Sequence, residues 1–524
     1  MECQYLKTKI GTVSPGQQDV SIPNDNNADL VETVDNTRSP SSPTTLNEEG
    51  PLGSMPFEVY TSNPPSLSQS GRQLGQRNEA LQNSVSPPLN AQDLELLTHY
   101  LSHTSQIIPY DKADLYALHI GIPNLAFNSE PLMSSLLALA AVCQCYDFLP
   151  KTGKPYDLPL SQIPKLLELA ERHHRNSLHQ IRKAIDTACY DIVLANATLM
   201  TLYGSAVHRV RIRLFNQYKE GRLGAPLLSE FVPAHSQWIS LIRAVHCAFI
   251  GLRTDLQLKE TEDSASPSSF QESASGVAIG DSVAEAQCSQ DGPAEQTLRL
   301  FLPIVTATID GAMEDLRRRV WRTKESDSVT RSDFTTCTGA LEILESIVAE
   351  TLPGIGNRNA TTLTPVSLHS DGFISRLSLV APWLRAYTAR VTSNSKLDSR
   401  SGSFTSSPLR RKITAFLNRV DANFLSLVQE MLERMTYPEL EETGPDPEDE
   451  SAASRCAMDI FAHWLVLMCL LDGVWWIGDI GMWELGRVAN YVKGLYGGEV
   501  GPNTKTWWPA SMYAIRTELA KQRM

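Results

Sequence analysis

The chain has 524 residues, of which 42% are hydrophobic, and its formal net charge at pH 7 is −13. At about 100–200 residues per domain, this length allows about two to four domains, or one large domain with disordered segments. An acidic chain does not bind nucleic acid through its overall field, because phosphate contacts need clustered Lys and Arg. The nine cysteines are scattered and form no Cys-x-x-Cys pair, which indicates free thiols in a reducing compartment.

The N-terminal region carries no recognisable packing pattern. It shows no basic start followed by an apolar run, so no signal peptide is expected. Residues 12–90 are rich in Ser, Pro, Asn, Gln and Gly and have no apolar period. Such a segment cannot bury enough surface to offset its ordering entropy, and we predict a disordered linker.

Helical periodicity begins at residue 91. Leucines recur at near-helical spacing over residues 91–108, and Asp93 is suited to cap the start. A second helix is predicted from Pro131, because proline suits the first helical turn. Its apolar face is backed by Ala and Ser, so we expect it to be buried on most sides.

Two further helices follow. Residues 162–185 carry an apolar stripe that includes His173, with most charges off the stripe. Asp191 is predicted to open the next helix, over residues 191–208. Its apolar body contains an Asn, a Gly and a Ser, and these small residues indicate that a neighbouring helix approaches closely.

The rest of the chain continues the helical pattern. Further helices are predicted at 236–252, 295–322, 334–351, 373–391 and 409–435, and in a Trp-rich region near the C-terminus. Residues 254–294 lack periodicity, and residues 438–450 form a Pro-interrupted acidic run, so we predict a disordered insert and an acidic loop. No convincing alternating strand is present. We therefore predict an all-α protein of roughly ten or more helices, with one large helical domain over residues 91–524.

The most apolar stretch, residues 460–480, is long enough to span a bilayer. It contains His463, Asp472 and Asp479, and each charged side chain would cost about 2.5–3.5 kcal/mol at the centre of a membrane. We predict a buried core helix followed by a turn, in a soluble intracellular protein without a membrane span.

Several clusters were weighed as metal sites. His173, His174 and His179 lie one, five and six residues apart, whereas metal-binding helices place ligands at i and i+3 or i+4. We predict a solvated helix with a single core histidine there. Cys143 and Cys145 diverge by about 200° on a helix, so we predict buried structural thiols.

Other charged groups give no catalytic pattern. Helical terpene cyclases hold magnesium and diphosphate on several carboxylates of a rigid wall, which the loop 438–450 and the single Asp472 do not provide. The basic clusters 317–322 and 409–412 suit import signals, although solvated helix faces are the preferred interpretation. The sequence holds no Gly-x-Ser-x-Gly, Walker, His-Glu-x-x-His or Gly-x-Gly-x-x-Gly motif. We expect no enzyme, and we assign no catalytic, cofactor-binding or metal-binding residues.

Four stretches carry a family resemblance. They are EPLMSSLLALAA (130–141), RHHRNSLHQIRKAI (172–185), ANATLMTLYGSA (195–206) and LLDGVWWIGDIGMWELGRV (470–488). In order and approximate spacing they resemble the helical regulatory domain of fungal zinc-cluster (Zn2Cys6) transcription factors, in the sterol uptake control protein-like subgroup. The resemblance covers about residues 91–491. It implies a nuclear transcription regulator in which an N-terminal six-cysteine domain holds two zinc ions.

The first residues fit the same resemblance. Residues 2–6, ECQYL, match the phrase in which the family's sixth cysteine precedes its linker, so residues 1–11 are expected to be a remnant of the end of the zinc cluster. Cys3 alone cannot build a two-zinc site. Zinc, and direct DNA contact, are therefore expected only in a product that carries further cysteines upstream.

Two functions are kept open. The first is a transcription regulator that controls a biosynthetic, secondary-metabolite gene set and acts through other transcription factors or coregulators. A lipid or metabolite ligand and a homodimer are both compatible with this function. The alternative is a helical small-molecule-binding protein or a biosynthetic enzyme. In the alternative an apolar pocket is lined by Trp464, Trp475, Trp476 and Trp483. The other interpretation of these tryptophans, which we favour, is that they fill the core.

Overall fold

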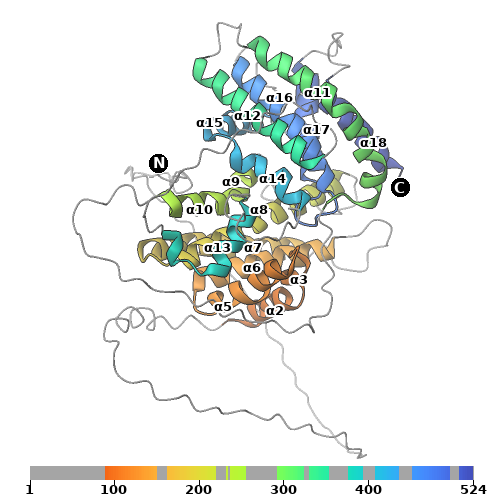
Figure 1. The fold of residues 1–524 in the computed structure, drawn as a ribbon. Coiled ribbons are helices and arrows are strands. Elements are labelled where there is room, and N and C mark those ends of the chain that lie inside the picture. The colour runs from red at the N-terminus through yellow and green to blue at the C-terminus, as the bar shows by residue number, and fades with distance from the viewer. Residues whose placement is uncertain are drawn as a thin grey trace, which may run out of the picture. The chain divides into compact units, whose positions relative to one another are not determined.

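The computed structural model describes ten main segments of the chain. They are residues 89–149, 162–219, 232–233, 236–254, 292–323, 330–352, 376–392, 408–435, 451–495 and 507–522. All of them lie in the compact unit that includes Ser86–Met524. They are 87% helical and contain no strand, which confirms the predicted all-α class (Figure 1).

Several sequence predictions fall outside these segments. The remnant at residues 1–11 lies outside them, as does the linker at 12–90 except for its last two residues. The insert at 254–294 and the acidic loop at 438–450 also lie outside, apart from residue 254 and residues 292–294.

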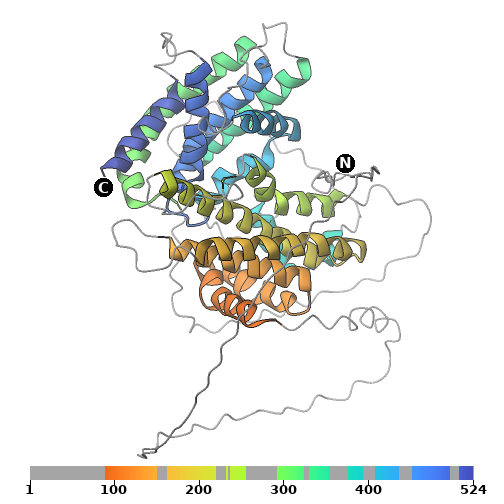
Figure 2. The same cartoon turned by 180° about the vertical axis from the view of Figure 1, so that it is seen from behind.

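Short helices lead into three long ones. The short elements are α2 (Ala91–His99), the π-helix η2 (Tyr100–Thr104), α3 (Ser105–Ile107), α4 (Lys112–Leu115), the π-helix η3 (Tyr116–Gly121) and α5 (Ile122–Ala126). The long helices are α6 (Glu130–Phe148), α7 (Gln162–Asp186) and α8 (Tyr190–Lys219). Helix α6 packs along α7 and α8, and α2 and α5 pack against α6 (Figures 1 and 2).

The long helices follow from their side-chain patterns. Helix α6 has Pro131 in its first turn and is buried around most of its circumference, as predicted. Helix α7 buries one apolar stripe, and its opposite face is charged. In α8, a Cβ built on Gly204 would lie 2.3 Å from Leu241 Cβ, which confirms the predicted close approach of another helix.

The remaining helices pack around α16 or alongside α8. The elements are α9 (Gln237–Ile242), α10 (Ala244–Thr254), η6 (Thr297–Phe301), α11 (Leu302–Thr323), α12 (Arg331–Thr351), η7 (Arg376–Leu379), α13 (Pro382–Val391), α14 (Leu409–Arg419), α15 (Ala422–Arg434), α16 (Ala452–Met468), η10 (Cys469–Leu471), α17 (Ile480–Leu495) and α18 (Trp508–Lys521). Helices α11, α12, α14, α15, α17 and α18 all contact α16, whereas α9, α10 and α13 pack with α8 or with one another.

Two helices are long and apolar enough to cross a membrane by length and composition. In α6 and in Ala452–Leu471, the most apolar windows are 72% and 83% buried inside the protein. The second of these includes the first half of the stretch 460–480, and turns follow it before α17 begins. The predicted core helix followed by a turn is confirmed.

Several helix boundaries differ from the sequence prediction. The helix predicted over 191–208 extends to Lys219 as α8. Asn90 caps α2, because its Oδ1 accepts from the backbone NH of Asp93 at 2.8 Å. The helix predicted over 236–252 is broken at Arg243. The helix predicted over 409–435 is also broken, because the Oδ1 of Asp421 accepts from the NH of Asn423 and starts α15.

Candidate functional site

A buried guanidinium ties α8 to the turn before α17. Arg209 is 2% exposed, and its Nη1 donates to Val474 O at 2.8 Å and to Trp475 O. Its Nε lies 3.4 Å from Asp479 Oδ2, which also accepts from Arg213 Nε at 2.8 Å. Burial by itself would raise the pKa of Asp479, but the two arginines outweigh it and lower the pKa to about 2.

Gly478 makes this contact geometrically feasible. Its φ is +31°, and a Cβ built on it would lie 2.0 Å from Arg209 Cζ. A side chain at this position would displace the guanidinium and strain the backbone. Gly478, the first glycine in WIGDIG, is therefore required for the turn to pack on α8.

A second buried ionic group joins α8, α15 and α17. Glu484 is fully buried, and its Oε1 lies 3.1 Å from His208 Nε2 while its Oε2 accepts from Arg487 Nη1 at 2.8 Å. Arg487 Nη2 donates to Leu432 O and Met435 O at 2.8 and 3.0 Å. Burial lowers the pKa of His208 more than Glu484 raises it, which favours the neutral imidazole.

Hydrogen bonds between small polar side chains join α6, α7 and α8. Ser177 Oγ lies 2.7 Å from Ser135 Oγ and accepts from Asn196 Nδ2 at 2.7 Å. All three side chains are buried. The polar residues in the three apolar helices therefore satisfy one another.

The four stretches that carry the family resemblance thus meet in one core. The serine and asparagine bonds join the first three stretches. Arg209 lies on α8 just beyond the third stretch and joins that helix to the fourth stretch through Asp479. We refer to these contacts together as the central junction. We take it as the candidate site, because its buried polar contacts link helices that are far apart in the sequence.

The sequence and the structure were compared with known protein families, curated proteins and solved structures. No family model, no curated protein and no solved structure matches the chain.

The predicted histidine cluster contains one core histidine, as expected, but its identity was wrong. His174 is 7% exposed and stacks on Tyr203 with ring centroids 4.4 Å apart. His173 lies at the border of the stripe, with Nε2 3.1 Å from Asp93 Oδ1. His179 is exposed, so the three rings do not converge on one point.

Both cysteines of the Cys-x-Cys pair are buried, as predicted. Cys145 Sγ lies 3.9 Å from Ile163 O at the start of α7. Burial, and next the neighbouring Cys143, raise the pKa of Cys145. Cys143 lies instead in a group of possible metal-binding side chains that includes residues of α2 and η2.

The basic cluster 409–412 is not the solvated face that we predicted. Arg410 and Arg411 are 7% and 8% exposed, and both approach the buried carboxylate of Asp114, with Arg411 the closer. Arg390 Nη2 donates to the other oxygen of Asp114 at 3.1 Å. Asp114 of α4 therefore binds arginines of both α13 and α14 in the interior. Arg410 and Arg411 are buried and are not accessible to an import receptor.

The second basic cluster, 317–322, does lie on a largely solvated face. Arg317 and Arg318 have side chains 42% and 57% exposed, and both pair with Glu314 of the same helix. Arg319 points inward and its Nε donates to Asp459 Oδ2 at 2.6 Å.

The tryptophans pack mostly in the core. Trp464 is fully buried and its Nε1 donates to Ile413 O at 2.9 Å, while Trp475 and Trp476 are 9% and 5% exposed. Trp464 also stacks with Trp238 at a centroid distance of 6.4 Å. These contacts favour the core-filling interpretation over a pocket lining.

Asp472 has a structural role in the observed contacts. Its Oδ1 accepts from Ala294 NH at 2.7 Å, and its Oδ2 accepts from Thr297 Oγ1 at 2.8 Å and from Arg516. The carboxylate therefore holds the start of the η6–α11 helix and α18 against the end of η10. The acidic run 438–450 lies outside the described residues.

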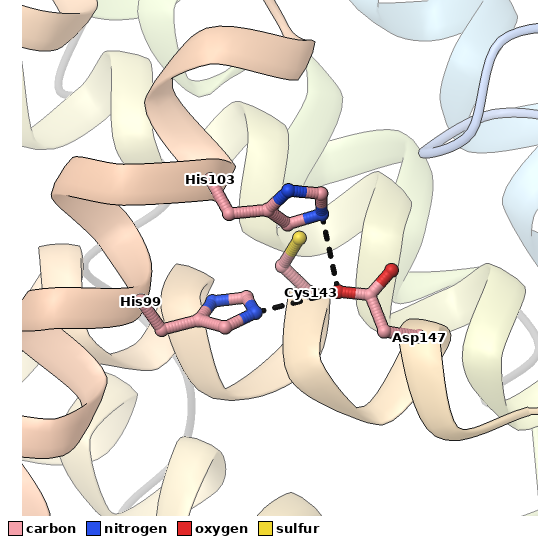
Figure 3. A group of neighbouring side chains, drawn as sticks. All are labelled: His99, His103, Cys143 and Asp147. Atoms are coloured by element: carbon pink, nitrogen blue, oxygen red, sulfur yellow. Dashed lines mark hydrogen bonds and ion pairs between the residues drawn. The ribbon is translucent and has the colours of Figure 1, made fainter.

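One cluster was not considered in the sequence analysis. Its members are His99, His103, Cys143 and Asp147, whose ligand atoms all lie within 4.8 Å of one another (Figure 3). The signal in the sequence is two pairs spaced four residues apart, HYLSH and CQCYD. Each pair alone is common, and only the packing of α2 and η2 on α6 brings the pairs together.

Proposed function

We propose that the chain is a transcription regulator of the fungal zinc-cluster type, whose helical part acts in the nucleus by contacting other proteins. In this proposal residues 91–524 are the regulatory domain, and they work by contact rather than by catalysis. The regulated genes belong to a biosynthetic pathway, and the partners are other transcription factors or coregulators. Zinc and direct DNA contact belong to this proposal only for a product that carries a cysteine cluster upstream of Cys3.

One observation carries the proposal. The four stretches that resemble the family are separated by up to about 340 residues along the chain. The first three nevertheless bond to one another, and α8, the helix that carries the third, bonds to the fourth through Arg209. Their polar residues form bonds between helices and are not lined up in a catalytic cleft. This arrangement supports the idea that the resembling stretches form a folded unit, because helix-packing residues are what such a unit would retain.

The alternative function, a small-molecule-binding protein or enzyme, has weaker support. It relies on the Trp-rich segment, and Trp464, Trp475 and Trp476 are packed against other side chains. A hollow of about 530 Å³ is lined by Glu295, Gln296, Arg299 and Leu300. It is open, and Trp464, Trp475, Trp476 and Trp483 are not among its lining residues, so it is not the tryptophan-lined apolar pocket that this alternative requires.

A tethered reporter assay tests the proposal. The 524-residue chain is fused to an unrelated DNA-binding domain whose operator lies upstream of an integrated reporter gene in a fungal host. We expect the fusion to change reporter output several-fold relative to the DNA-binding domain alone. The matched control is the same DNA-binding domain fused to an unrelated helical protein of similar size.

A second measurement distinguishes the alternative. The purified chain is heated with and without a panel of sterols, fatty acids and other apolar metabolites. Stabilisation by a ligand together with an unchanged reporter would favour the small-molecule function. A changed reporter without any ligand effect would favour regulation through protein partners alone.

A further inference from the structure

We propose that the cluster at the junction of α2, η2 and α6 binds one divalent transition-metal ion, with zinc as the preferred metal. Its members are His99, His103, Cys143 and Asp147. We call them the His–Cys–Asp cluster. The proposal does not depend on the proposed regulatory function, because it concerns only the chemistry of these four side chains.

The cluster has nearly the dimensions of a zinc site. Zinc lies about 2.0–2.3 Å from nitrogen, oxygen and sulfur ligands in a tetrahedron, which sets neighbouring ligand atoms roughly 3.3–3.8 Å apart. In this structure the Nε2 atoms of His99 and His103 lie 3.3 and 3.2 Å from the same Asp147 oxygen, Oδ2. With all four donor atoms within 4.8 Å of one another, small side-chain rotations suffice to close them around an ion.

The backbone positions favour convergence of the four donors. His99 ends α2 and His103 lies in the π-helical turn η2, four residues later. Cys143 and Asp147 are likewise four residues apart on α6, so each pair occupies one helical face. Short π-helical turns inside α-helices are found frequently at functional sites, and here the turn carries His103, one of the four proposed ligands.

The donor set selects the class of metal. Two imidazoles, a thiol and a carboxylate provide nitrogen, sulfur and oxygen donors, a combination suited to zinc and its neighbours in the first transition row. Magnesium and calcium prefer oxygen donors alone. On binding, the Cys143 S–H bond breaks, its proton passes to solvent and its electron pair forms the bond between sulfur and metal.

A buried hydroxyl positions one of the imidazoles. His99 Nδ1 lies 3.1 Å from the Oγ1 of Thr104, which is fully buried. If the ring donates its Nδ1 hydrogen to this oxygen, Nε2 is left with a lone pair directed at the cluster. Second partners of this kind usually fix the orientation of metal-binding histidines.

Charge and exposure also suit a cation. Asp147 lies in the last turn of α6, where the helix dipole disfavours a carboxylate and an adjacent positive charge offsets this cost. The side chains of His103 and Asp147 are 43% and 31% exposed, whereas Cys143 is fully buried. Solvent therefore reaches the cluster at His103 and Asp147 but does not reach the thiol of Cys143. Figure 3 shows the four side chains pointing toward one another.

Cobalt titration of the full chain tests this site. Cobalt(II) replaces zinc and gives a charge-transfer absorption band only when a thiolate is bound to it. After chelator treatment and gel filtration under reducing conditions, we expect the band to grow until one equivalent of cobalt is added. Adding zinc should then abolish the band by displacing cobalt.

Four variants assign the site to named side chains. Cys143→Ser should remove the thiolate band, and His103→Asn should weaken cobalt binding by more than about tenfold while the band persists at saturation. Cys145→Ser is the matched control for a buried cysteine two residues away. His173→Gln is the control for a histidine that contacts only one aspartate. Both controls should bind cobalt like the unmodified chain.

Three results would overturn the proposal. They are the absence of a cobalt band in the full chain, a band that persists in Cys143→Ser, and equal cobalt affinity of His103→Asn and the unmodified chain. Circular dichroism of each variant reports whether it is folded. Because the side chain of His103 is partly exposed, that variant tests the site even if Cys143→Ser does not fold. In the case of any of these results, the cluster is a set of His–Asp contacts that packs α2 on α6.

Discussion

At the scale of single residues, His174 illustrates what a sequence pattern can and cannot specify. The apolar stripe of α7 predicts one core histidine in the run ERHHRNSLH, and the structure contains one. Adjacent helical residues differ by about 100° in direction, so the border of the stripe decides between His173 and His174. Tyr203 of α8 provides the stacking partner of His174, and a neighbour from another helix is not visible in the local pattern.

This buried histidine should make stability depend on pH. Burial lowers the pKa of His174 to about 4, and Glu171 opposes this while Arg211 and Arg175 add to it. In the unfolded chain a histidine has a pKa of about 6.5, so the unfolded state binds more protons between these values. The contribution of His174 to stability is fully present above about pH 6.5 and is lost as the pH falls toward 4.

We therefore expect His174→Phe, which retains an aromatic ring against Tyr203, to flatten the loss of stability between pH 7 and 4. Urea denaturation at closely spaced pH values measures this slope. His179→Gln is the control, because its side chain is exposed. An identical slope in His174→Phe and the unmodified chain would contradict the lowered pKa, because it would mean that His174 takes up its proton at the same pH in the folded and unfolded states.

The His–Cys–Asp cluster shows the same limit for a site. Its two pairs of residues four apart can be read from the sequence, but the contact between them spans about 45 residues. The packing of α2 against α6 decides that contact. A sequence search limited to neighbours therefore examines Cys143 with Cys145 and passes over His99.

At the scale of helices, close packing was predictable but the packing partner was not. The small residues in α8 predict a near neighbour, and Leu241 of α9 lies against Gly204. The helix breaks at Arg243 and Asp421 were missed, because apolar periodicity continues across them. Caps and short turns depend on backbone hydrogen bonds that hydrophobic spacing does not report.

Glycine substitutions separate packing from helix propensity. Gly204→Ala should lower the free energy of unfolding by about 1–3 kcal/mol, because the new methyl group overlaps Leu241. Gly311 lies in α11 with no atom within 4 Å of a built Cβ. Gly311→Ala should raise stability by about 0.5–1 kcal/mol, because alanine favours a helix over glycine. Chemical denaturation measures both, and a stabilising Gly204→Ala would contradict the described contact of α8 and α9.

At the scale of the whole helical unit, buried charges join distant parts of the chain. Glu484 contacts His208 across 276 residues, and Asp114 contacts Arg411 across 297 residues. The all-α class follows from helical periodicity alone, whereas these pairs require knowledge of which helices meet. The sequence interpretation of residues 409–412 as a solvated face failed for this reason, since their partner lies on α4.

Removing a buried charge should therefore cost far more than removing a surface one. Glu484→Ala leaves Arg487 without its buried carboxylate partner, and we expect the free energy of unfolding to fall by about 3–5 kcal/mol. Glu518 forms a similar pair with Lys521, but its side chain is 67% exposed. Glu518→Ala should cost less than about 1 kcal/mol. Equal losses in urea denaturation would mean that Glu484 does not hold α8 and α17 together.

The most direct test of the account is the reporter output of the tethered 524-residue chain. The account predicts a several-fold change relative to the DNA-binding domain alone, and no such change with the unrelated helical protein in the same fusion. Reporter output equal to that of the DNA-binding domain alone, with the fusion present in the nucleus at the same level, would contradict the proposed regulatory function.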